Sequence, residues 1–115
     1  RSRGLGDVYK RQGEIETSMM RALRPDSVRM ERAEYFRSTS QDRAGRFATL
    51  GNGRSAKLGW MMQDYNANGA VGNAAAATAE KGHALLDAAG RALARLLAEI
   101  DQLPPGTLTD KTAFS

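Results

Sequence analysis

The clearest pattern of hydrophobic and polar positions lies between Ala74 and Gln102. Small and aliphatic residues recur there every three or four positions, which predicts a long amphipathic helix that ends before Pro104. The stripe consists of Ala75, Ala79, Gly82, Leu86, Ala89, Leu93, Leu96, Leu97, Ile100 and Leu103. Glycine costs about 1 kcal/mol relative to alanine inside a helix. We therefore expect a neighbouring element to approach this helix closely at Gly82.

A second helical pattern follows Gly13. Ile15, Met19 and Leu23 fall on one helical face, and the acidic residues at its start suit the positive end of the helix dipole. Pro25 disfavours helical backbone at the residue before it. We predict a short helix that ends at this proline.

The segment between residues 27 and 50 predicts two shorter elements. A short strand is expected around residues 27–30. The hydroxyl side chains of Ser38 and its two neighbours are good N-caps for a helix through Phe47 and Leu50, and the glycines of residues 51–53 would end it.

The segment from Lys57 to Tyr65 is rich in bulky residues and predicts a strand or an extended loop. The composition of residues 66–69 is typical of a turn. The chain therefore offers few strands for its long helix to cover. This mismatch indicates that part of the domain lies outside the sequence.

The distribution of charge decides how the net charge is interpreted. The formal net charge is +4, but residues 1–12 hold four basic residues and one acidic residue. Residues 13–115 hold 13 basic and 12 acidic residues, so we expect no nucleic-acid partner. Residues 1–12 show no helical or strand period and are predicted to be a non-native leader or linker. The domain then covers residues 13–115.

The composition is that of a globular protein, with 41% hydrophobic and 26% charged residues. No apolar run reaches the roughly 18 residues that a membrane span needs, so no membrane partner is expected. The sequence contains no cysteine, which agrees with a reducing compartment, and we expect a cytoplasmic location.

Few side chains could carry chemistry. His83 is the single histidine, whereas a zinc or manganese site generally needs three or more histidine or carboxylate ligands. No metal ligand is predicted, and His83 is interpreted as a surface or boundary residue. Glu14 and Glu16 flank Ile15 at a helix entrance, where one carboxylate could face a cleft. Acidic residues at this place also stabilise a helix without any catalytic role.

Two stretches of the sequence resemble the creatininase family. GEIETSMMRALRPDSVRM, from Gly13, is similar to the segment after the family's His-Ala-Gly motif, where H-A-G-E-x-E-T-S precedes a short helix. GNAAAATAEKG, from Gly72 to Gly82, resembles the family's small-residue run that ends in Glu-Lys-Gly. The resemblance extends to Pro104. It implies a catalytic role for Glu16, with Glu14 as the second candidate, and it assigns no substrate-binding residue.

The resemblance implies an α/β fold, with this chain as the C-terminal part of a three-layer αβα domain. That part is expected to be mostly helical and to end in the long amphipathic helix. The implied activity is metal-dependent hydrolysis of the C–N bond in small cyclic or linear amides such as creatinine. A water activated by zinc or manganese attacks the carbonyl, and a nearby acid protonates the leaving nitrogen. Family members are commonly hexamers of identical chains.

The sequence departs from the family at the metal ligands. Arg11 occupies the position expected for the family histidine and Gln12 that of a small residue, while the family's E-x-H and G-H-x-E-N motifs are absent from the sequence. We expect a fragment that lacks the metal-binding half, holds no metal and is inactive alone. An alternative hypothesis is a small helical binding or assembly module that uses the Ala74–Gln102 helix.

Overall fold

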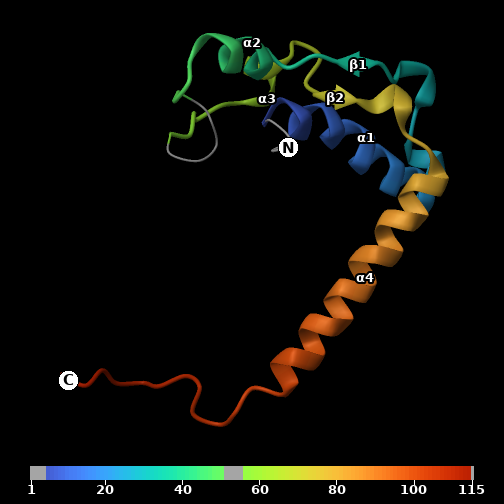
Figure 1. Ribbon diagram of the computed structural model, residues 1–115. Helices are drawn as coiled ribbons and strands as arrows, with labels where there is room; N and C mark the ends of the chain where they lie inside the picture. The colour runs from blue at the N-terminus through green and yellow to red at the C-terminus, as the bar shows by residue number, and fades with distance from the viewer. Residues whose placement is uncertain (1–4, 51–55, 115) are drawn as a thin grey trace. The chain divides into compact units, whose positions relative to one another are not determined.

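The computed structural model describes residues 5–50 and 56–114, and only the backbone of residues 5–12. The chain forms two compact units, Arg1–Leu85 and Leu86–Ser115. Helices account for most of the regular structure (Figure 1). The labelled elements are α1 (Leu5–Leu23), β1 (Tyr35–Phe36), α2 (Thr39–Arg46), α3 (Met62–Tyr65), β2 (Gly72–Asn73) and α4 (Ala79–Asp101).

Helix α1 ends where the sequence predicts but begins earlier. Its last turn closes with a 2.7 Å hydrogen bond from the Arg24 amide to the Met20 carbonyl, immediately before Pro25. The predicted start near Gly13 is wrong, because the helix begins at Leu5. Residues 5–12 lack a clear apolar period, yet they contain no proline that would stop a helix. The proposed boundary between residues 12 and 13 stays a prediction.

The strands lie elsewhere than predicted. The strand expected at residues 27–30 is wrong: residues 27 and 30 belong to two 3-10 helices, Pro25–Ser27 and Met30–Arg32, and residues 28 and 29 connect them without strand structure. Pro25 suits the first position of such a tight turn, because its ring fixes φ in the helical range. The observed strands β1 and β2 pair antiparallel, with Tyr35 opposite Asn73 and Phe36 opposite Gly72.

Helix α1 lies against β2 and the 3-10 helix that follows it, Ala74–Ala76 (Figure 1). The buried hydrophobic residues of this unit are Tyr65, Val71, Ala74 and Ala77. The core is therefore built largely from small side chains. One helix on a two-stranded sheet agrees with an α/β fold, while the three-layer arrangement stays a prediction.

Helix α2 starts as predicted, with the Ser38 hydroxyl accepting a hydrogen bond from the Ser40 amide at 3.2 Å. It ends at Arg46, so the predicted extension through Leu50 is wrong. Phe47 already has extended backbone, with φ −124° and ψ 123°. The expected break at residues 51–53 lies outside the described residues.

Residues 57–61 form no regular element, and Met61 has extended backbone. Residues 62–65 form the single turn of α3, so the predicted strand or extended loop is wrong for these four residues. The Asp64 carboxylate caps this turn by accepting a hydrogen bond from the Met61 amide at 2.8 Å. The predicted turn at residues 66–69 is confirmed by a 3.0 Å hydrogen bond from the Gly69 amide to the Asn66 carbonyl. Gly69 has φ +74°, a conformation that favours glycine.

The long helix is confirmed as α4, but it begins at Ala79, after a 3-10 turn, and not at Ala74. The Thr78 hydroxyl accepts a hydrogen bond from the Lys81 amide at 3.2 Å, as an N-cap does. From Leu86 onward the helix belongs to the second unit. Among the described residues, no helix is both long enough and apolar enough to span a membrane.

Candidate functional site

The two sequence stretches that resemble one family lie against each other in the first unit. A Cβ atom at Gly82 would lie 1.9 Å from the carbonyl oxygen of Ser18 and 2.9 Å from Cβ of Ala22. A Cβ atom at Gly13 would lie 2.6 Å from the carbonyl oxygen of Val71. Only glycine fits at either position. The predicted close approach at Gly82 is therefore confirmed, and the partner is α1.

Partly buried hydrogen bonds join the same two stretches. The side chain of Ser18, which is 1% exposed, accepts a 3.1 Å hydrogen bond from the backbone amide of Thr78. The guanidinium of Arg21 donates to the carbonyl of Ala77 at 2.7 Å. These bonds satisfy backbone groups just before α4. We refer to this contact between residues 13–22 and residues 71–82 as the motif junction.

Glu14 lies at one edge of the motif junction. Its carboxylate accepts a 2.7 Å hydrogen bond from the Lys81 ammonium, which also donates to the Ala76 carbonyl at 2.8 Å. The Glu14 side chain is 28% exposed and that of Lys81 is 49% exposed. An ion pair with this exposure contributes about 1 kcal/mol at most. Glu14 thus helps to fix Lys81 and borders a cavity of about 490 Å³.

Glu16 borders a different cavity. Residues two apart on a helix do not face each other, so Glu14 and Glu16 point to different sides of α1. Glu16 is exposed and lines a groove of about 390 Å³ between α1 and the 3-10 helices that follow it. The structure therefore does not bring the two carboxylates into one cavity. Their catalytic assignments stay predictions.

The described residues do not fit a divalent metal site. Among residues 13–50 and 56–114, whose side chains the structure describes, no three histidine, cysteine, aspartate or glutamate side chains are grouped so that they could hold an ion. His83 is exposed on α4, as the sequence predicts for a surface histidine. The position of the expected family histidine, Arg11, lies in the part of α1 whose side chains are not described.

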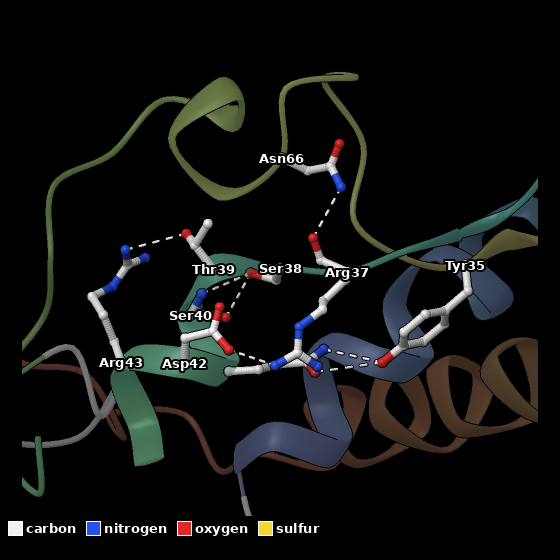
Figure 2. Close-up of polar contacts among 9 residues, drawn as sticks. Tyr35, Arg37, Ser38, Thr39, Ser40, Asp42, Arg43 and Asn66 are labelled. Carbon is white, nitrogen blue, oxygen red and sulfur yellow. Dashed lines mark hydrogen bonds and ion pairs between the residues drawn. The ribbon is translucent and has the colours of Figure 1, made fainter. Parts of the chain in front are cut away.

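A polar network around α2 is the second concentration of polar side chains (Figure 2). Arg37 forms an ion pair with Asp42 and donates a 3.1 Å hydrogen bond to Gln41. The side-chain amide nitrogen of Gln41 donates to the Tyr35 hydroxyl at 3.2 Å. These contacts connect β1 to the first turns of α2, so we interpret them as structural.

The same network also reaches the loop after α3, where the Asn66 side chain donates to the Arg37 carbonyl at 2.9 Å (Figure 2). Thr39 donates a 2.7 Å hydrogen bond to the Asp64 carbonyl and accepts one from Arg43 at 3.2 Å. The Arg43 guanidinium lies 5.2 Å from the ring centroid of Tyr65, which in turn lies 4.5 Å from that of Trp60. The Arg43 guanidinium therefore makes a cation–π contact with Tyr65, and the two rings pack against each other at a tilt of 60°.

Sequence reasoning missed two arginines in the groove of Glu16. Arg29 and Arg32 both line it; Arg29 lies near the end of the first family-like stretch and Arg32 just after it, but neither was predicted as a site residue. Their spacing of three residues could have suggested a shared face, but only for a helical segment. The sequence predicted a strand there.

Comparison with known proteins gives one result. A family model described as Creatininase: Creatinine amidohydrolase matches residues 12–97, about three quarters of the chain. No curated protein and no solved structure matches the chain.

Proposed function

The chain belongs to the creatininase family, and from this premise we propose that it takes part in hydrolysing the C–N bond of small cyclic or linear amides. The observation that carries the proposal is the motif junction. It joins the two stretches that resemble the family through Gly82, Ser18 and the Lys81–Glu14 ion pair. These contacts give both stretches a defined place in one unit.

We assign the proton-transfer role to Glu16. Its carboxylate borders a groove whose volume of about 390 Å³ falls in the range of small-molecule sites, about 300–1,000 Å³. A carboxyl group beside a bound amide can protonate the leaving nitrogen or orient the attacking water. Glu14 is the second candidate, but its contact with Lys81 also gives it a structural role.

The family resemblance further implies zinc or manganese, which would activate the attacking water in the complete enzyme. The described residues do not supply a ligand set, so we propose that the ligands come from residues outside this sequence. The chain of 115 residues by itself should then neither bind metal tightly nor hydrolyse creatinine. Calorimetric titration with zinc or manganese tests this, and a stoichiometric sub-micromolar site would contradict it.

The role of Glu16 is tested in the natural protein that contains this sequence. Glu16→Gln should lower kcat for its amide substrate by about 10²- to 10⁴-fold, because the substitution removes the proton-transfer group and keeps the shape of the side chain. Glu31→Gln is the matched control, since Glu31 lies on the neighbouring 3-10 helix and does not line the groove. Equal kcat values for the two variants would contradict the assignment.

A further inference from the structure

The groove beside Glu16 combines an apolar surface with two cationic side chains. Met20, Val28, Phe36 and Ala74 contribute apolar atoms from four segments of the first unit. Arg29 and Arg32 line the same groove. Concave sites of this kind bind small molecules through apolar contact and use a few polar groups for orientation.

The two groove arginines differ from the paired arginines of the chain. Arg37 pairs with Asp42, Arg91 pairs with Asp87, and Arg21 donates to a backbone carbonyl. In the part of the chain that the structure describes, the guanidinium groups of Arg29 and Arg32 have no hydrogen-bond or ion-pair partner. Two guanidinium groups without protein partners at one groove suit an anionic group, which arginine recognises with paired hydrogen bonds.

Acidic side chains near the groove limit what the anion can be. Glu16 lines the groove itself, and Glu34 lines the neighbouring depression together with Arg32. A ligand with several negative charges would be repelled by Glu16, whereas a single carboxylate matches the small excess of positive charge. The amide part of the same molecule could then lie toward Glu16.

We propose that this groove binds small amides that carry one carboxylate, with the carboxylate held by Arg29 and Arg32. The inference rests on the proposed function for the amide end of the ligand only. The recognition of the carboxylate does not depend on hydrolysis. It adds a substrate class to the proposed activity and assigns its specificity to two arginines on the segment that follows α1.

The first experiment compares two probes that differ in charge alone. N-acetylglycine and N-acetylglycinamide are titrated into the full chain, and binding is followed by backbone amide NMR shifts. N-acetylglycine should bind saturably, about tenfold more tightly than the neutral probe, because it makes charge-assisted hydrogen bonds. The largest shifts should occur at Thr17, Val28 and Ala33. Equal affinity of the two probes, or shifts centred on residues 1–12 or on Lys81, would overturn the proposal.

The second experiment uses matched arginine variants. Arg29→Gln and Arg32→Gln should each weaken binding of N-acetylglycine about tenfold and leave binding of N-acetylglycinamide unchanged. Arg24→Gln removes the same charge from the same segment, but Arg24 does not line the groove, so this control should bind like the parent chain. If Arg24→Gln weakens binding as much as the groove variants do, the attraction is only general charge and the proposal fails.

The binding and hydrolysis results can fail separately. Charge-selective binding without hydrolysis of any amide by the natural protein would refute the proposed function and leave the carboxylate site intact. Hydrolysis of carboxylate-bearing amides by the natural protein, with kcat/KM unchanged in Arg29→Gln and Arg32→Gln, would support the function and refute the carboxylate site.

Discussion

The motif junction and the second unit, Leu86–Ser115, differ in which side chains are buried. In the motif junction the key residues are small, and Gly82, Ser18 and Ala77 are almost fully buried. In the second unit the large residues Leu93, Leu96 and Leu97 remain 50–57% exposed. Apolar size thus does not determine burial in this chain.

The difference in burial follows from the contacts that glycine and leucine side chains permit. A glycine lets two backbones approach until their polar groups can bond, and the bond from the Thr78 amide to the Ser18 hydroxyl is an example. Leucine contributes to stability only when another apolar surface covers it. Close backbone contacts therefore hold the first unit together, whereas the leucines of the second unit leave about half of their surface exposed.

The largest expected effect comes from adding one methyl group to the motif junction. Gly82→Ala should destabilise the chain by about 3 kcal/mol or more, because the new Cβ would lie against the backbone carbonyl of Ser18, which cannot move aside easily. Gly90→Ala is the control in the same helix, where a Cβ meets nothing within 4 Å. It should stabilise the chain by about 0.5–1 kcal/mol. Urea denaturation followed by circular dichroism measures both, and similar midpoints for the two variants would refute the close approach.

A smaller effect is expected from removing the buried hydroxyl of the motif junction. Ser18→Ala should cost about 1–3 kcal/mol, because the Thr78 amide loses its partner away from water. Ser27→Ala removes an exposed hydroxyl from the neighbouring 3-10 helix and should change stability by less than about 0.5 kcal/mol. Thermal denaturation of both variants measures the two losses of stability. A loss in Ser27→Ala as large as that in Ser18→Ala would count against the buried bond.

The smallest effect is expected in the second unit. Leu96→Ala should cost less than about 1 kcal/mol, because Leu96 is already 50% exposed, whereas a buried leucine costs about 2–5 kcal/mol. The measurement is chemical denaturation at several protein concentrations. A large loss that grows with concentration would show that another copy covers the stripe, as the hypothesis of a helical assembly module requires.

The sequence predicted those parts of the fold that depend on local rules. Pro25 ended α1 and Ser38 capped α2, because each acts on its own neighbours in the chain. The prediction of a strand near residues 27–30 was wrong, since strand formation depends on a pairing partner that lies elsewhere in the sequence. Only the structure identifies β2 as the partner of β1.

The candidate site was less predictable than the fold. Gly82 could be recognised as a close contact from its cost in a helix, but not its partner Ser18, which is 64 residues away in the sequence. The separation of Glu14 and Glu16 follows from helix geometry once α1 is assigned. No sequence pattern identified Arg29 and Arg32 as site residues, because the groove that they line also includes residues from other segments, such as Phe36 and Ala74.

The side chain of Asn66, which follows α3, both donates and accepts a hydrogen bond. The side-chain oxygen of Asn66 accepts a hydrogen bond from the backbone amide of Asn68 at 2.8 Å. Its side-chain nitrogen donates to the Arg37 carbonyl at 2.9 Å (Figure 2). Aspartate forms the same turn but has no hydrogen to give. Deamidation of Asn66 to aspartate would place a carboxylate oxygen against the Arg37 carbonyl, and the hydrogen bond between this loop and the residue that follows β1 would be lost.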